Sequence, residues 1–97
     1  MIVLKPEAEQ DLAGAVVWYE RQRQGLGGQF LAETDLAMAR IESNPRLYRK
    51  VHGELRRALM RRFPYAVYFL ADEGTVTVYG VLHQRRAPAV WQRRYPG

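Results

Sequence analysis

The spacing of apolar residues changes along the chain, from every third or fourth residue to every second residue. The first spacing, over residues 6–24 and 28–44, is typical of amphipathic α-helices. The second spacing, over residues 65–71 and 75–83, is typical of half-buried β-strands. Helices followed by strands indicate an α+β fold, in which helices cover one face of an antiparallel sheet.

The two helical segments are expected to form a hairpin. Pro6 stands in the first turn of the first helix, where its missing N–H is tolerated, and acidic residues follow it near the positive end of the helix dipole. The glycine-rich residues 25–28 are expected to end this helix. The second helix is expected to end at Asn44, because a residue before proline is driven out of the α region. The short connection predicts that the helices lie antiparallel.

Short strands precede and follow the helix hairpin in the sequence. A first strand is expected at residues 2–4, and residues 45–53 are expected to form a loop. Residues 55–62 are a candidate strand, and Asp72-Glu73-Gly74 is expected to be the turn before the last strand. The predicted order is therefore β-α-α-β-β-β, with the N-terminal helix hairpin packed on one face of a small, mainly antiparallel sheet. We expect a single domain over residues 1–97.

Alternation in the last two strands divides their side chains between the two faces of the sheet. The set expected in the core beneath the helices is Val67, Phe69, Val76, Val78 and Leu82. The set expected to form an open, half-exposed recognition surface is Ala66, Tyr68, Leu70, Thr75, Thr77, Tyr79, Val81 and His83. A slip of one residue in this assignment would exchange the two faces.

Positive charge is concentrated in the second half of the chain. The whole sequence carries 15 Lys and Arg against 10 Asp and Glu, a net charge of +5, while residues 1–50 are balanced. Nearly all of the basic residues are arginine, which binds phosphate and carboxylate groups in two places and stacks on bases. The charge therefore indicates nucleic acid or an acidic protein as a partner. The alternative is a solvated basic face that serves only solubility.

Composition excludes several classes of protein. The chain has no Cys, so a disulfide framework, a thiolate zinc site and a thiol nucleophile are excluded, and two His make a His-rich metal site unfavourable. No apolar run approaches the roughly 18 residues of a membrane span, and the N-terminal segment lacks the pattern of a signal peptide. We expect a cytoplasmic protein that uses neither a metal nor a cofactor.

Two groups of residues carry the candidate chemistry. Arginines with interleaved aromatic residues favour a binding surface, and the set is Arg56, Arg57, Arg61, Arg62, Arg85, Arg86, Arg93 and Arg94 with Tyr65, Tyr68, Tyr79 and Trp91. His83, at the end of the last strand, is a candidate general acid or base beside arginines that would hold a phosphate. The alternative for His83 is a hydrogen bond to a loop. His52 falls in an expected loop, where we predict an exposed side chain without a role.

Several segments of the chain form a recognisable series: Ala8 to Leu12, Trp18 to Glu20, Gly27 to Phe30, Asn44-Pro45, Arg56 to Tyr65, and Val81 to Arg86 followed by Pro88 and Trp91. In this order, and with the predicted β-α-α-β-β-β arrangement, they resemble the RelE/ParE superfamily of toxins from type II toxin–antitoxin modules. Each segment is moderately specific, but their order and spacing together are specific and cover nearly the whole chain. The resemblance implies a small toxin that a cognate antitoxin holds inactive in a hetero-oligomer.

Members of this superfamily divide into two activities. RelE-like members cut mRNA on the ribosome, and ParE-like members inhibit DNA gyrase. If the chain were a nuclease, the resemblance would place the catalytic groups at His83, Arg57, Arg61 and Arg85. However, Ala66 stands where RelE-like nucleases have an active-site arginine, and the lysines of their second strand are absent. Arginine is also a poor base, because it is nearly always protonated.

We therefore expect a ParE-like toxin without enzymatic activity that inhibits DNA gyrase. The residues expected to bind partners are Arg57, Arg61, Tyr68, Tyr79, His83, Arg85, Arg86 and Trp91. One alternative is a ribosome-dependent endoribonuclease that cuts mRNA without a metal. The other is a non-toxic binding module with the same fold.

Overall fold

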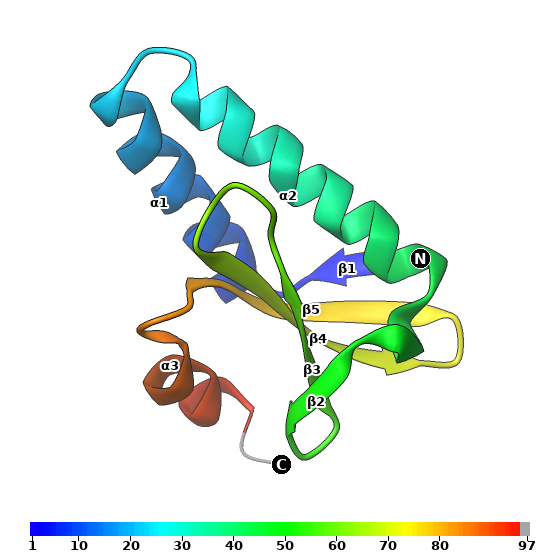
Figure 1. The fold of residues 1–97 in the computed structure, drawn as a ribbon. Helices are drawn as coiled ribbons and strands as arrows, with labels where there is room; N and C mark the ends of the chain where they lie inside the picture. Colours follow the sequence, from blue (N-terminus) through cyan, green and yellow to red (C-terminus); the bar gives the residue numbers. More distant parts are fainter. Residues whose placement is uncertain (96–97) are drawn as a thin grey trace.

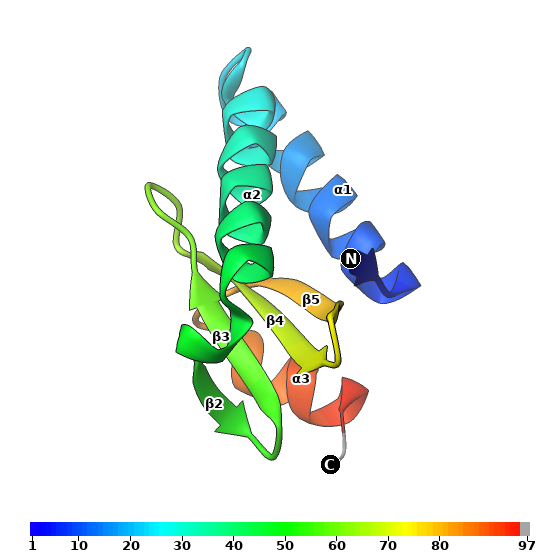
Figure 2. The ribbon, with the colours of Figure 1, turned by 90° about the vertical axis from the view of Figure 1, so that its right-hand side faces the viewer.

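The computed structural model describes residues 1–95 (Figure 1). Its centre is a five-stranded mixed sheet with the strand order β1-β5-β4-β3-β2. Two long helices lie on one face of the sheet, and a short helix lies on the other (Figures 1 and 2). The elements are β1 (Ile2–Leu4), α1 (Pro6–Gln22), α2 (Leu26–Ser43), the 3-10 turn η1 (Pro45–Leu47), β2 (Arg49–His52), β3 (Leu55–Leu59), β4 (Tyr65–Asp72), β5 (Thr75–His83) and α3 (Ala87–Arg94). The predicted α+β class and the helix hairpin on one face are confirmed.

The sheet is antiparallel except at one edge, where β1 pairs parallel with β5. The turn between β4 and β5 contains Glu73 with φ of 41° and Gly74 with φ of 82°. Two successive positive φ angles twist a two-residue turn to match the strands that it joins, and glycine adopts them at little cost. The hairpin expected at this position is confirmed.

An aromatic cluster fixes the helix hairpin to the sheet. Phe30 of α2 is fully buried, and its ring centre lies 5.1 Å from Tyr19, 5.2 Å from Phe63 and 4.9 Å from Tyr65. Aromatic pairs at these distances contribute about 0.5–1.5 kcal/mol each beyond the burial of their surface. The cluster therefore joins α1, α2 and the segment that leads into β4.

One carboxylate closes the connection between α1 and α2. Glu20, near the end of α1, accepts hydrogen bonds from the backbone N–H groups of Gly25 (2.9 Å) and Gly27 (3.0 Å). These donors belong to the beginning of α2, where a helix leaves N–H groups unpaired and its dipole favours a negative charge. Consequently α2 begins at Leu26 and includes two of the glycines that were expected to interrupt the helices.

A bulge in β5 changes which side chains face the helices. Gly80 lies opposite Tyr68 and Val78 lies opposite the next residue of β4, so Tyr79 is an extra residue in β5. An extra residue shifts the alternation by one position. Val67, Phe69, Val76 and Val78 lie in the core beneath the helices, as predicted, and the bulge places Val81 there too. The assignment of Leu82 to that core is wrong, because Leu82 packs on the opposite face with Trp91.

The structure contains three elements that the sequence pattern does not predict: η1, β2 and α3. The expected loop over residues 45–53 is wrong, because η1 and β2 form there and β2 pairs with β3. The Arg-rich tail folds into α3, which covers the sheet face that was expected to be open (Figure 2). The candidate strand over residues 55–62 is shorter than expected, since β3 ends at Leu59. Arg61 and Arg62 therefore lie in the β3–β4 loop.

The close approach of α1 and α2 predicts a large difference between two neighbouring glycines. A Cβ atom on Gly27 would lie 2.6 Å from the carbonyl oxygen of Val16, whereas a Cβ on Gly28 would meet nothing within 4 Å. We expect Gly27→Ala to lower the free energy of unfolding by about 1–3 kcal/mol, because the helices must separate. The matched variant Gly28→Ala should leave it unchanged or raise it by up to about 1 kcal/mol. Urea unfolding measures both values, and equal effects would contradict the argument.

Candidate functional site

A groove lies at the end of the sheet where β4 begins and β5 ends, between α1 and α3. Its volume is about 770 Å³. In Figure 1 this region is on the left, where the chain passes from β5 to α3. The groove is lined by Gln10, Asp11, Gly14, Ala15, Trp18, Tyr19, Pro64, Tyr65, Val81, Leu82, His83, Arg86, Val90 and Arg94. Three of the residues expected to carry function, His83, Arg85 and Arg86, lie at or beside it.

An ion pair between α1 and α3 forms one wall of the groove. The guanidinium of Arg94 binds the carboxylate of Asp11 through two bonds, of 2.5 and 3.0 Å. The two side chains are 23% and 13% exposed, so the pair is largely shielded from water. The hydrogen bond to Asp11 raises the pKa of Arg94 further above its already high ordinary value, although burial opposes the shift. The carboxylate of Asp11 thus offsets the positive charge of Arg94 within one ion pair.

The same two side chains also bind the backbone of β5. Because β1 ends at Leu4, β5 has no neighbouring strand on that side beyond Val78. There the N–H of Val81 donates to Asp11 (3.1 Å), and Arg94 donates to the carbonyl oxygen of Tyr79 (3.2 Å). A Cβ on the intervening Gly80 would lie 3.2 Å from Arg94, so glycine gives the guanidinium room. The pair thus satisfies backbone groups that the sheet leaves unpaired.

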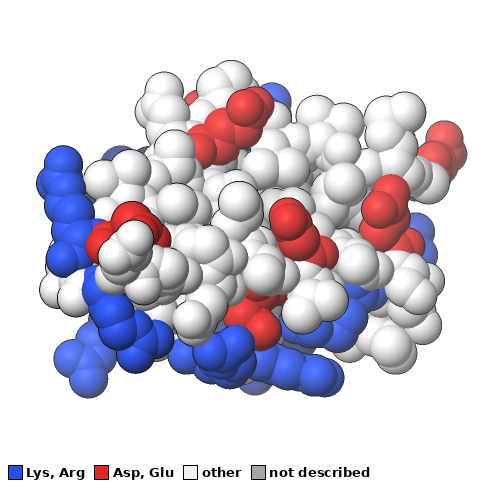
Figure 3. Space-filling model, turned by 90° about the horizontal axis from the view of Figure 1, so that it is seen from above, with Lys and Arg blue, Asp and Glu red and all other residues white. Residues whose placement is uncertain are grey.

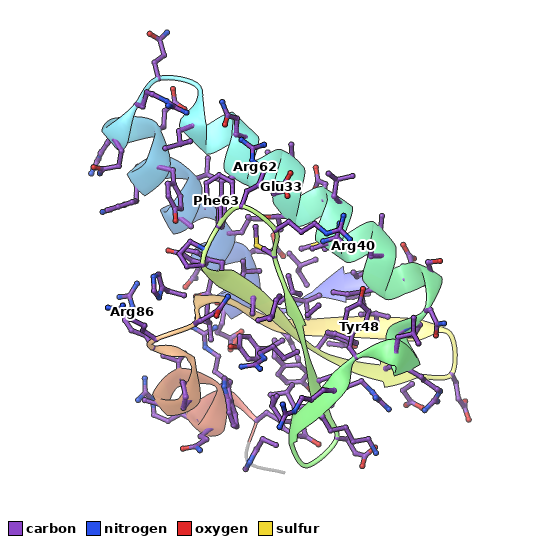
Figure 4. The ribbon with its side chains drawn as sticks, in the orientation of Figure 1. Glu33, Arg40, Tyr48, Arg62, Phe63 and Arg86 are labelled. Carbon is purple, nitrogen blue, oxygen red and sulfur yellow. The ribbon has the colours of Figure 1, made fainter. Side chains whose placement is uncertain are left out.

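The rim of the groove combines aromatic rings with positive charge. Trp18 is 56% exposed, and Tyr65 contacts the imidazole of His83 edge to face, with ring centres 5.4 Å apart. Nδ1 of His83 accepts the N–H of Arg85 at 3.1 Å, so the neutral ring carries its proton on Nε2. Arg86 is exposed, and its side chain extends away from the ribbon (Figure 4).

The opposite face of the sheet is not an open recognition surface. Trp91 of α3 is buried against Tyr68 and His52, with ring centres 6.3 and 5.0 Å away. Tyr68 is 1% exposed, and its hydroxyl has no hydrogen-bond partner among residues 1–95. Burial raises the pKa of Tyr68, and the nearby charge of Arg57 opposes only part of that rise. The predicted open face is therefore wrong, and Tyr68 and Trp91 are core residues of this layer.

Two further predictions on this face need correction. His52 was expected to be exposed in a loop, but it lies in β2 and is half-buried against Trp91. Tyr79 is half-buried, in keeping with the half-exposed side chain that was expected, and its ring centre lies 5.6 Å from that of Tyr95. His83 was expected on this face, but beyond the bulge it packs against Tyr65 on the other side. The two differences follow from α3, whose Trp91 covers His52, and from the bulge in β5, which turns His83.

The basic residues do not gather at one point. Arg57 lies opposite Tyr68 and His83 lies opposite Tyr65, on the two sides of β4. The Cα atoms of Arg57 and His83 are therefore roughly 14 Å apart, because they are offset by three residues along the strands and by two strand spacings across the sheet. Arg61 is exposed in the β3–β4 loop. Figure 3, seen from above the helix hairpin, shows basic side chains along the left and lower edges of the molecule and acidic side chains between them.

Neighbouring Arg62 is held against α2. It donates a hydrogen bond to Gln29 (3.0 Å) and lies 3.8 Å from the largely buried carboxylate of Glu33 (Figure 4). Its backbone adopts a φ of 72°, which is uncommon for a residue other than glycine. These contacts hold the β3–β4 loop against α2. Of the two arginines in this loop, Arg62 is the one held by α2, and the exposed side chain of Arg61 is available for binding.

The sequence of residues 2–88 matches the profile of a family described as "ParE toxin of type II toxin-antitoxin system, parDE". The match covers most of the chain. The chain belongs to the ParE toxin family. Its fold is similar to a structure from P. aeruginosa described as "Chromosomal ParDE TA system", with a TM-score of 0.75 and 9% identity over 84% of this chain and 92% of that one. At this identity the likeness shows a shared fold. No curated protein sequence matches the chain significantly.

Sequence reasoning missed Asp11, and its pairing with Arg94, in the groove of this ParE-family chain. Asp11 lies between Ala8 and Ala15 on the stripe of α1 that faces the core. A carboxylate at a core-facing helical position signals a buried partner. That partner, Arg94, lies beyond the residues that match the ParE family profile. Within residues 1–95, no helix is long and apolar enough to cross a membrane, and no cluster of His, Asp or Glu suits a metal.

The ion pair of this ParE-family toxin predicts strong coupling between α1 and α3. We expect Asp11→Ala and Arg94→Ala each to lower the free energy of unfolding by about 1.5–3 kcal/mol. Each substitution leaves a charged side chain and a backbone group without their hydrogen-bond partner. The double variant should lose little more than either single variant. Urea unfolding measures all three values.

An exposed ion pair supplies the matched control. Lys50 and Glu54 lie 3.1 Å apart with side chains 45% and 72% exposed, so Glu54→Ala should cost about 0–1 kcal/mol. If Asp11→Ala destabilises the protein no more than Glu54→Ala, the structural role of the buried pair is refuted.

Proposed function

We propose that this chain is a ParE-type toxin that inhibits DNA gyrase by binding it and that a cognate antitoxin neutralises it in the cytoplasm. The observation that carries the proposal is family membership over residues 2–88. The arrangement of the basic residues supports it. They are dispersed over the surface, and some of them line or flank a groove with an aromatic rim. This arrangement suits binding of a partner more than acid–base chemistry.

The positions of the titratable groups favour a toxin that is not an enzyme. Cleavage of RNA without a metal needs one group to take the proton of the 2′-hydroxyl and another to protonate the leaving oxygen. Among the residues that line the groove, His83 is suited to such a transfer, while the carboxylate of Asp11 is bound to Arg94. Arg57 lies across the sheet from His83. Ala66, which replaces an arginine of RelE-like nucleases, is fully buried.

An apolar surface on the helix hairpin supports an antitoxin as a partner. A second groove of about 640 Å³ is lined by Leu4, Glu9, Leu12, Ala13, Val16, Val17 and Leu31. Val17 and Leu31 are 48% and 40% exposed, which leaves apolar area for an amphipathic segment to cover. Segments of this kind often fold as they bind and wrap a large area. A hetero-oligomer of toxin and antitoxin follows from this proposal.

The test of the proposal compares two targets with one purified protein. We expect inhibition of DNA supercoiling by gyrase and accumulation of cleaved DNA, and no ribosome-dependent cutting of mRNA in a translation extract. His83→Ala should weaken gyrase inhibition by less than about tenfold, because one polar contact contributes about 0.5–1.5 kcal/mol. Cutting of mRNA that disappears in His83→Ala would instead establish the nuclease. Inhibition of neither target would favour the non-toxic binding module.

The arginine pair beside the groove predicts a second result. Arg85→Ala combined with Arg86→Ala should abolish growth inhibition in cells, because both side chains are exposed and available to the target. Arg21→Ala combined with Arg23→Ala removes the same charge at the end of α1 and should leave growth inhibition intact. Circular dichroism and urea unfolding of both double variants verify that they fold. Equal loss of toxicity in the two variants would show that net charge, rather than this site, is responsible.

A further inference from the structure

The groove between α1 and α3 has a composition that inhibition of gyrase does not by itself require. Exposed aromatic rings beside a free guanidinium suit the two parts of a nucleotide, because a base stacks on the ring and a phosphate pairs with the guanidinium. We propose that this groove binds one unstacked nucleotide of a single-stranded nucleic acid, with its base on Trp18 and its phosphate on Arg86. This site goes beyond the proposed function, because it gives the toxin a nucleic-acid contact of its own.

Trp18 supplies the stacking surface. It is 56% exposed although indole is among the largest apolar side chains, and it lines the groove. Tyr19 holds the indole edge-on, with ring centres 5.0 Å apart and planes at 89°. The indole is therefore held in place by a neighbour while much of its surface stays open to a base. Tyr65 and His83 extend the aromatic lining at the same end of the groove.

Arg86 supplies the anion site. Among residues 1–95, the ion pairs of basic side chains involve Lys50, Arg62 and Arg94, so the exposed Arg86 has no carboxylate partner there. The carboxylate that lines the groove, Asp11, is neutralised by two bonds from Arg94. The lining therefore carries a net positive charge at its mouth, which attracts phosphate.

The dimensions and hydrogen-bonding groups also suit a nucleotide. A volume of about 770 Å³ lies within the range of sites for small organic ligands. The Nε2–H of His83 and the amide of Gln10 give donors and an acceptor for the edge of a base. A base in a duplex is already stacked and paired, so the groove selects single strands. An acidic peptide without aromatic residues would use the arginine but would leave the stacking surface without a matching group.

Gly14 allows the groove to be filled without disturbing the fold. It lines the groove on α1, and a Cβ there would meet nothing within 4 Å. Gly14→Gln thus projects a side chain into the groove and also favours the helix, because glutamine is a better helix former than glycine. The matched control is Gly28→Gln, which adds the same side chain at an exposed helical glycine that does not line the groove. Urea unfolding of both variants verifies their stability.

The test uses fluorescence anisotropy with a short labelled thymidine oligonucleotide. We expect saturable binding that Gly14→Gln weakens by at least tenfold and Gly28→Gln leaves unchanged. Trp18→Ala should weaken binding by about tenfold, because stacking contributes about 1–3 kcal/mol per base. Arg86→Ala should weaken it and lower its dependence on salt. Unchanged affinity of Gly14→Gln, or no saturable binding by the unaltered protein, would overturn the proposal.

Intrinsic fluorescence locates the bound base. The chain has two tryptophans, and Trp91 of α3 is 8% exposed because it packs against the sheet, so quenching by the oligonucleotide should come from Trp18. Trp18→Phe should keep most of the affinity and abolish the quenching. Quenching that persists in Trp18→Phe would overturn the proposed position.

Two comparisons separate nucleotide recognition from other binding. A duplex of the same sequence should bind more weakly and with no effect of Gly14→Gln, because it contacts only surface arginines. An acidic, aromatic peptide that binds the groove more tightly than the oligonucleotide would overturn the proposal in favour of a protein ligand. Because no assay here contains gyrase, failure of this proposal leaves the proposed function standing, and failure of gyrase inhibition leaves this one standing.

Discussion

The bidentate ion pair between Asp11 and Arg94 stabilises the structure at the part of β5 that has no neighbouring strand on one side. β5 is the central connection of the molecule, because it pairs with both β1 and β4 and contacts α1 and α3. Where β1 ends, a stretch of β5 backbone would face solvent unpaired. Asp11 and Arg94 take up those backbone groups and at the same time join the helices on the two faces of the sheet. This ion pair therefore satisfies the exposed edge of β5 and also forms one wall of the groove between α1 and α3.

The bulge at Tyr79 makes this arrangement possible. By adding one residue to β5, it places Val81 beneath the helices and Leu82 beneath α3. It also sets the N–H of Val81 within reach of α1. Bulges often occur beside functional sites because they redirect side chains. Here the redirected residue is His83, which turns to the rim of the groove instead of the face that α3 covers.

The sequence predicts the parts of the fold whose signals are local. The long amphipathic helices, the two central strands and the turn before Thr75 are periodic and bounded by glycine or proline, so their prediction is confirmed. β2 has four residues and α3 has eight, which is too short for a clear period. His83 and Arg86 can be proposed from sequence as neighbours in a site. The pairing of Asp11 with Arg94 joins residues 83 positions apart, and no local pattern reveals it.

That separation has a consequence for how the molecule is made. β1 pairs with residues 76–78 of β5, so β1 cannot join the sheet until β5 has been synthesised. Contacts between distant parts of a chain form slowly, since a long loop must close before they bring any gain. The groove needs α3 as well, and α3 is the last element among residues 1–95. A nascent chain that has not yet been synthesised through α3 therefore lacks the groove.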